Sequence, residues 1–373
     1  MEKIDLKKFY NGEYPFEVMM NMIQNNKDIP FNNRIIMITY KINDNGFIKV
    51  RDIDKSNKEN LIKVIKNRTP SQIEIGKFYD KFEDFGGSIF MTKNIKEFLF
   101  DIDANDFDVD ENKDLLLLFK AFNNNIIINN EFKSIRICEC IGKKQVCKEC
   151  WYLIGSSALV IKFFMENLFQ IKKFLWVYSG NRGIHCWIND KQLNNLDSEA
   201  RKSILKMISF SSDQSLFQIL SEENVMIMNL YKQLESYFKE YVLSNSIIFT
   251  KLKPLILEFI KIYYSLIYNK LNENWKDWNY FEKLSKSNSQ WKYQNINIIQ
   301  PHKFIIFRLL YPLFDENVNQ LYHLLKLPFS FHSKTQNLSF PVQYEEIPFI
   351  LDLKQNFKIE ERLKLINDLF YFF

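Results

Sequence analysis

Glycine and proline are scarce in this chain, with nine of each among 373 residues, and there are only five cysteines and four histidines. No apolar run reaches the roughly 18–20 residues that a membrane-spanning helix needs, so we expect no membrane segment. The first residues, Met1 to Asp5, are too charged for a secretory signal. We therefore expect an intracellular protein in a reducing compartment, where cysteines act as metal ligands or thiols before they form disulfides.

The chain is long enough for one large domain with a subdomain, or for two domains. Its net charge of +5 is compatible with a polyanionic ligand, which would need the positive charge to be focused locally. The sequence contains no internal repeat and no long low-complexity linker.

Strand-like runs dominate the N-terminal third, whereas the stretch 198–300 lacks glycine and follows helical spacing. That change predicts an inserted helical subdomain. A mixed pattern returns after Pro301, and Lys358–Phe373 favours an amphipathic helix. Together these patterns predict an α/β fold with a mixed or antiparallel sheet. The expected strands are Arg34–Tyr40, Phe47–Arg51, Glu97–Asp103, Phe174–Ser179 and Ile184–Asn189, and the expected long helix is Trp151–Phe169.

Two aspartates, Asp101 and Asp103, end an apolar strand-like run. Side chains alternate along a strand, so the two carboxylates share a face while Ile102 takes the other. Paired carboxylates repel each other unless a cation lies between them, and oxygen ligands suit Mg²⁺ or Mn²⁺ in nucleotidyl transfer. The alternative is that both aspartates cap the strand end and face water, because Asp-x-Asp is a short pattern.

Four of the five cysteines, Cys138, Cys140, Cys147 and Cys150, fall within thirteen residues. Tetrahedral Zn²⁺ takes four such ligands, and Cys-x2-Cys lets two thiolates reach one ion from a tight turn. No open coordination position is evident, so the pattern predicts a structural zinc site. The alternative is four thiols, or disulfides in a different compartment.

Two of the nine glycines lie in the segment from Ser179 to His185, between two expected strands. Glycines in such a turn let backbone N–H groups converge on an anion, and Arg182 can donate two hydrogen bonds to a phosphate. The alternative is a plain hairpin turn with a core histidine, since Gly-x-x-Gly alone is a weak signal.

A third polar segment begins at Asp315 and continues through His323, Lys326 and His332. It offers one more carboxylate, followed by a lysine and a histidine six residues apart, and lysine binds phosphate as a point charge. The alternative is a solvated helix end followed by a loop that Pro328 breaks.

These features, in this order, resemble the catalytic small subunit of the archaeal and eukaryotic replicative DNA primase. The resemblance extends from about Phe9 to about Val342, is weak in the helical insert and is closer to the eukaryotic form. The best-matching stretches are Glu97–Asp108, Cys147–Trp151, Leu175–Asp190 and His323–Val342.

The resemblance implies a role for each matching residue. Asp101, Asp103 and Asp315 would be catalytic carboxylates that bind Mg²⁺ or Mn²⁺, and the four cysteines would hold structural Zn²⁺. Glu74 would approach the ribose 2′-hydroxyl of the incoming nucleotide. The other implied nucleotide contacts are Arg51, Ser179, Arg182, His185, Lys326 and His332.

Some positions depart from the family pattern. Asn181 stands where many members have a second arginine, Ile35 where many have Glu, and Glu74 replaces Asp. Glu139 separates two cysteines that are adjacent in a common eukaryotic form, and the segment 315–326 is one residue short. These departures bear on nucleotide affinity and primer length rather than on the class of reaction.

The implied organisation is a primase-type catalytic core at 1–197, with a zinc knuckle at about 136–151. A helical subdomain at 198–300 follows, then a return to the core at 301–345 and a C-terminal segment at 346–373 with a helix.

The implied activity is that of a DNA-directed RNA polymerase, a nucleotidyltransferase that starts short RNA primers de novo on single-stranded DNA from NTPs. The implied partners are the primase large subunit and the DNA polymerase alpha complex, in the nucleus. Two alternatives remain: a repair or translesion primase-polymerase of the same superfamily, and a catalytically weak nucleic-acid-binding subunit.

Overall fold

The computed structural model describes the chain in segments. They are residues 5–25, 30–43, 46–51, 53–79, 82–85, 88–91, 94–104, 146–209, 224–263, 271, 277–287, 292–293, 296–297, 300–312, 314–315, 317–332, 335–353 and 358–370. The chain divides into two compact units. The first comprises 1–102, 169–207 and 314–373, and the second comprises 103–168 and 208–313.

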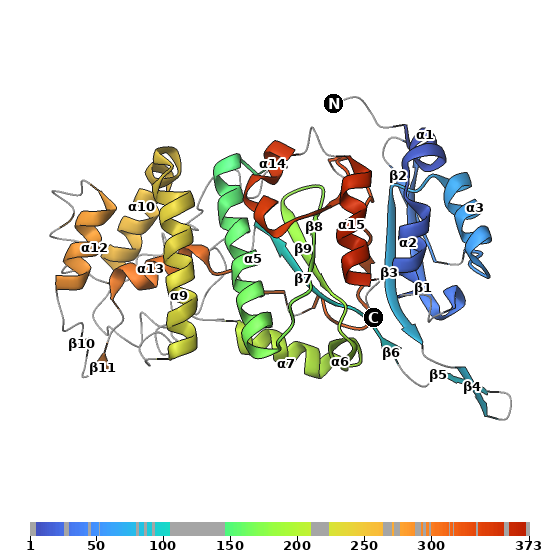
Figure 1. Ribbon diagram of the computed structural model, residues 1–373, viewed down its shortest axis with the longest axis horizontal. Helices are drawn as coiled ribbons and strands as arrows, with labels where there is room; N and C mark the ends of the chain where they lie inside the picture. Colours follow the sequence, from blue (N-terminus) through green and yellow to red (C-terminus); the bar gives the residue numbers. More distant parts are fainter. Residues whose placement is uncertain are drawn as a thin grey trace. The chain divides into compact units, whose positions relative to one another are not determined.

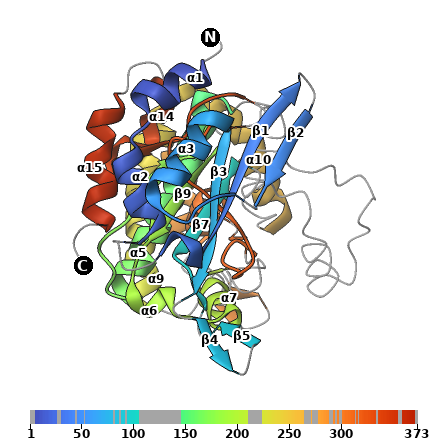
Figure 2. The same cartoon turned by 90° about the vertical axis from the view of Figure 1, so that its right-hand side faces the viewer.

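The first sheet of unit 1 has the strand order β12-β3-β1-β2, with β6 also paired to β3 and β2 at one edge (Figure 2). The described strands of this sheet pair antiparallel. Its apolar side chains Ile36, Ile38, Ile73 and Ile75 are buried. The strands are β1 (Arg34–Asn43), β2 (Gly46–Val50), β3 (Gln72–Tyr79), β6 (Asn94–Ile95) and β12 (Leu325–Lys326).

The second sheet of unit 1 has the order β13-β8-β9-β7. Every residue of β8 and β9 is buried, and apart from Gly183 and His185 both strands are apolar throughout rather than alternating. Helix α15 (Ile359–Phe370) packs on β13, β8 and α2 (Figure 1). The strands are β7 (Phe98–Asp103), β8 (Leu175–Tyr178), β9 (Gly183–Ile188) and β13 (Phe340–Val342).

Short helices and one hairpin complete unit 1. Helix α3 begins after the N-cap Asn57, whose side chain accepts a hydrogen bond from the Asn60 N–H at 2.8 Å, and it ends at Thr69 in the left-handed conformation. The elements are α1 (Leu6–Lys8), η1 (Phe9–Glu13), α2 (Phe16–Ile23), η2 (Phe31–Asn33), α3 (Lys58–Arg68), β4 (Phe82–Phe85), β5 (Ser88–Met91), α6 (Lys191–Asn194), α7 (Ser198–Ile208), η5 (Tyr344–Phe349) and α14 (Ile350–Leu353).

The described part of unit 2 is mainly helical. Helix α9 packs against α5 and α13, and the Tyr237 hydroxyl on α9 donates to the Tyr152 carbonyl oxygen at 2.6 Å. Pro301 occupies the first turn of α13, where its missing N–H leaves no hydrogen bond unmade. The elements are α5 (Lys148–Leu168), α9 (Val225–Tyr237), η4 (Phe238–Leu243), α10 (Ser246–Tyr263), α12 (Trp278–Ser287), β10 (Lys292–Tyr293), β11 (Ile296–Asn297) and α13 (Pro301–Leu310).

The α/β class with antiparallel sheets is confirmed, and the expected strands and the helices near 151–169 and 358–373 are present. The helices predicted between 198 and 300 are seen as α7, α9, α10 and α12, whereas their status as an inserted subdomain stays a prediction. Among the described residues, no helix is both long enough and apolar enough to cross a membrane.

Candidate active site

Strand β7 presents Asp101 and Asp103 as its two half-exposed residues, while Phe98, Phe100 and Ile102 are buried. This burial pattern follows from strand alternation, which places both carboxylates on the face opposite Ile102. The Asp101 side chain is 43% exposed. A carboxylate in that position is accessible to a ligand.

His185 comes from β9, the neighbour of β7 in the sheet. Its Nε2 atom lies 3.4 Å from Oδ1 of Asp101, and its side chain is only 10% exposed. The structure therefore brings His185 to Asp101, one of the predicted metal-binding carboxylates. The family resemblance instead implies that His185 contacts the triphosphate of the incoming nucleotide.

The turn after β8 is built around Ser179 and Gly180. The Ser179 hydroxyl accepts hydrogen bonds from the N–H groups of Asn181 and Gly183, at 3.4 and 3.2 Å. Gly180 has φ +87°, and a Cβ atom there would lie 2.8 Å from the Asn337 carbonyl oxygen and 3.1 Å from Cβ of His332. Glycine is required because the turn packs directly against the loop that carries His332.

Lys326 ties this turn to the first sheet. It lies on β12 opposite Glu74 on β3, and its Nζ atom donates to the Ser179 carbonyl oxygen. Burial lowers the pKa of Lys326 to about 8, and the charges of Asp101 and Glu74 oppose that shift. The lysine is thus close enough to both carboxylates to feel their charge.

The nearly buried Glu74 has a partner that the sequence reasoning missed. Nζ of Lys49 lies 3.6 Å from Oε2 of Glu74. Arg51, the predicted contact, is exposed and follows the last residue of β2. The missed signal was strand alternation, since Lys49 and Arg51 are two residues apart and share a face.

Asp315 lies in the irregular segment after α13, and its exposed carboxylate accepts a hydrogen bond from the Asn317 N–H at 2.8 Å. The half-buried side chain of His323 is close enough to Asp315 and to Asp101 on β7 to be affected by both charges. Burial and the charge of Lys96 lower the pKa of His323, whereas Asp101 and Asp315 both oppose the shift. Arg182 is half-buried.

The three carboxylates do not form a closed cage. Within the segments that the structure describes, no group of three or more His, Cys, Asp or Glu side chains is placed to hold a metal ion. The chemistry of the donor set still fits Mg²⁺ or Mn²⁺, because all three predicted ligands are carboxylates and Asp101 and Asp315 are accessible.

The zinc prediction lies largely outside the described residues, which include neither Cys138 nor Cys140 nor the side chain of Cys150. Cys147 is half-buried and directly precedes α5, where its carbonyl oxygen accepts a hydrogen bond from the Trp151 N–H at 3.2 Å. The four-cysteine site therefore stays a prediction.

A buried charged network behind β7 was also missed from the sequence. Arg34 makes two hydrogen bonds to Glu97, of 3.0 and 2.7 Å, and both side chains are 0% exposed. Arg201 donates to the carbonyl oxygens of Lys96 and Glu97. Lys96 and Glu97 join β6 to β7, so this network holds the N-terminal end of the strand that carries Asp101.

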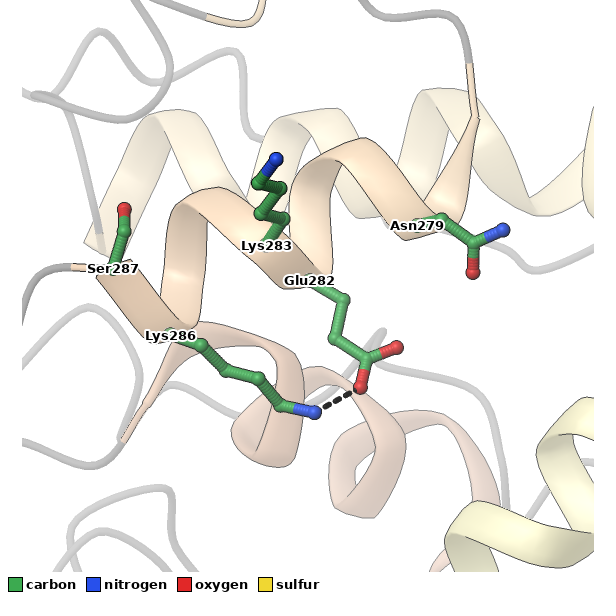
Figure 3. Close-up of a pocket in the computed structure, with 5 residues that line it drawn as sticks. All are labelled: Asn279, Glu282, Lys283, Lys286 and Ser287. Atoms are coloured by element: carbon green, nitrogen blue, oxygen red, sulfur yellow. Dashed lines mark hydrogen bonds and ion pairs between the residues drawn. The ribbon is translucent and has the colours of Figure 1, made fainter.

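Unit 2 has a hollow of about 440 Å³ on α12, lined by the five residues drawn in Figure 3. The side chains of Glu282 and Lys286 form an ion pair on that helix. Among the described residues, the lining of the hollow comes from α12 alone and includes none of the predicted site residues. It offers no chemistry comparable with the Asp101 cluster.

The sequence matches the family described as DNA primase small subunit over residues 100–344. The DNA primase small subunit of Saccharomyces cerevisiae is 25% identical, covering 94% of this chain and 84% of its own length. That of Drosophila melanogaster is 27% identical, covering 84% and 70%. Among solved structures, the polymerase domain of Mycobacterium tuberculosis ligase D in complex with DNA is similar over 99% of this chain and 92% of its own, with 10% identity and a TM-score of 0.42. The match to about two thirds of the sequence shows that this chain belongs to the DNA primase small subunit family.

Proposed function

We propose that this chain is the catalytic subunit of a DNA primase, which synthesises short RNA primers de novo on a single-stranded DNA template. The observation that carries the proposal is the gathering of Asp101, His185, Lys326 and Ser179 in unit 1. These residues come from three distant parts of the chain, and all of them lie inside the family match.

The basic residues of the site suit the triphosphate of an incoming NTP. Lys326 supplies a half-buried ammonium group beside the Ser179 turn, where the Arg182 guanidinium can also donate. His332 lies against Gly180 in the same turn. Neutralising the triphosphate here would orient its α-phosphate toward the carboxylates of β7.

Asp101, Asp103 and Asp315 would hold Mg²⁺ or Mn²⁺, which supplies charge neutralisation for in-line nucleotidyl transfer with release of pyrophosphate. The contact of 3.4 Å between Nε2 of His185 and Oδ1 of Asp101 would fix the orientation of that carboxylate. No protein nucleophile is needed, because the 3′-hydroxyl of the growing RNA attacks the α-phosphate.

Glu74 is the candidate for recognising the ribose. It lies opposite Lys326 on the neighbouring strand, so a nucleotide whose phosphates bind Lys326 would bring its sugar close to Glu74. Its carboxylate could accept a hydrogen bond from the 2′-hydroxyl, which would favour ribonucleotides over deoxynucleotides. Lys49 would hold the Glu74 side chain in place.

The remaining assignments are proposals from the family alone. They are a structural zinc site at Cys138, Cys140, Cys147 and Cys150, the domain boundaries given above, and a nuclear location. The partners would be the primase large subunit and, through it, the DNA polymerase alpha complex.

The test is primer synthesis on a poly(dT) template with labelled ATP and Mg²⁺ or Mn²⁺. Wild type should make short RNA, and Asp101→Ala should make none while remaining folded. Asp368→Ala is the matched control, because it removes an exposed carboxylate of α15 in the same unit. Full activity in Asp101→Ala would refute the assignment, and a preference for deoxynucleotides would favour the repair polymerase.

A further inference from the structure

The segment from Asp315 to His323 contains turns but neither helix nor strand among its described residues. It nevertheless carries a proposed metal ligand at one end, and His323 at the other. A catalytic carboxylate on irregular backbone must be held by something other than a backbone ladder, because displacement by about 1 Å can lower a rate about a hundredfold.

Asn319 supplies the first part of that support. Its Oδ1 atom accepts the Leu99 N–H at 2.8 Å, and its Nδ2 atom donates to the Leu99 carbonyl oxygen at 2.6 Å. Strand β7 stands at the end of its sheet among the described strands. The Asn319 amide thus occupies the position of a neighbouring strand, two residues before Asp101.

Lys96 supplies the second part. Its Nζ atom donates to the carbonyl oxygens of Val318 and Gln320, at 3.1 and 2.7 Å, which are the residues on either side of Asn319. The lysine is 0% exposed, and Asn319 is 1% exposed. Four hydrogen bonds from two buried side chains therefore join residues 318–320 to residues 96–99.

A buried lysine is an expensive way to stabilise a fold. Burial lowers the pKa of Lys96 to about 7, and Arg201 and Arg34 add repulsion. An apolar residue of similar volume would fill the space without that penalty. The polar pair instead specifies one register of the 315–323 segment against β7, which is where precision is needed.

We propose that Lys96 and Asn319 are positioning residues for catalysis, which set the placement of Asp315 relative to Asp101 by fastening residues 318–320 to β7. The inference rests on the proposed function. The contacts of both side chains described above are to protein backbone, so in this proposal both act through the carboxylate that they place.

The experiment compares wild type with Asn319→Ala, Lys96→Met and the control Asn33→Ala. Asn33 is also a buried amide of unit 1, and it donates to the Tyr79 carbonyl oxygen at 3.1 Å. Binding of Mn²⁺ is counted from the EPR signal of the free ion, and the Mg²⁺ concentration for half-maximal primer synthesis is measured. All assays are made well below the unfolding temperature of each variant.

Asn319→Ala and Lys96→Met should weaken Mn²⁺ binding about tenfold or more and raise the Mg²⁺ midpoint in parallel, as loss of a ligand's supporting contacts does elsewhere. Asn33→Ala should leave both values at the wild-type level, even if it lowers stability. Wild-type Mn²⁺ affinity in a folded Asn319→Ala or Lys96→Met would overturn the inference alone. Wild type without Mn²⁺ binding or synthesis would overturn the proposed function itself.

Discussion

Removing Glu97 should destabilise the protein more than removing its partner Arg34. Glu97 is the one carboxylate of the network that also contains Arg34, Lys96 and Arg201, and its side chain is fully buried. Replacing it by glutamine leaves the Arg34 guanidinium without a counterion, which costs about 3–5 kcal/mol for a buried pair. Arg201 also loses a favourable interaction. Burial lowers the pKa of Arg201 to about 10, and the charge of Glu97 opposes that shift.

Removing Arg34 has a smaller effect because Glu97 keeps cationic neighbours. Arg34→Met deletes two charge-assisted hydrogen bonds, each worth about 1.5–3 kcal/mol, but it also removes the desolvation cost of the buried guanidinium, and Arg201 and Lys96 still compensate the carboxylate. The double variant Arg34→Met/Glu97→Gln should be more stable than Glu97→Gln alone, because it contains one buried cation fewer.

Urea unfolding followed by circular dichroism measures all four proteins, and the double-mutant cycle gives the coupling free energy. A loss for Arg34→Met that equals or exceeds the loss for Glu97→Gln would refute the reasoning. So would a double variant no more stable than Glu97→Gln.

Three further predictions follow from individual residues. Lys326 has a pKa of about 8 and must be charged to bind a triphosphate, so the KM for ATP should rise as pH increases through 8. Lys326→Arg should remove that rise, because arginine stays charged in this range. The same dependence of KM on pH in wild type and Lys326→Arg would contradict the role. Gly180→Ala should lower the free energy of unfolding by about 1–3 kcal/mol and raise the KM for ATP, because φ is +87° and the new Cβ atom would meet the Asn337 carbonyl oxygen. A Gly180→Ala variant with wild-type stability in thermal unfolding would contradict this prediction. Burial holds the pKa of His302 at about 4 against 6.5 when exposed, so stability is full above pH 6.5 and falls by up to about 3 kcal/mol as pH drops toward 4. His302→Gln should show a shallower fall in urea midpoint over that range, and an unchanged slope would refute the assignment.

The chemistry of the site could be predicted from the sequence wherever a local pattern carries it. Strand alternation placed Asp101 and Asp103 together, and scarce glycines marked the Ser179 turn, whose close approach to His332 explains Gly180. The same alternation also predicts that Lys49 lies on the face of β2 shared with Arg51, where it contacts Glu74.

The supporting residues could not be predicted in the same way. Asn319 and Lys96 bond to backbone groups more than two hundred residues away along the chain, and no local spacing reveals such a contact. Glu97 was noted only as the start of a strand, because a single carboxylate gives no sign of the arginines that will surround it. The predicted zinc site lies largely outside the described residues, so its support remains the cysteine pattern and the family resemblance.

The positions of β12 and β13 determine when unit 1 can be completed during synthesis. Both sheets contain a strand drawn from residues 325–342, with β12 pairing to β3 and β13 pairing to β8. A nascent chain that has emerged only as far as α13 therefore has β3 and β8 without these partners, and such open edges attract other strands. Long sequence separations of this kind slow folding and prolong the exposure. Ribosome-bound chains should thus need protection until residues 325–342 have been made, and C-terminal truncations before β13 should aggregate rather than yield a smaller enzyme.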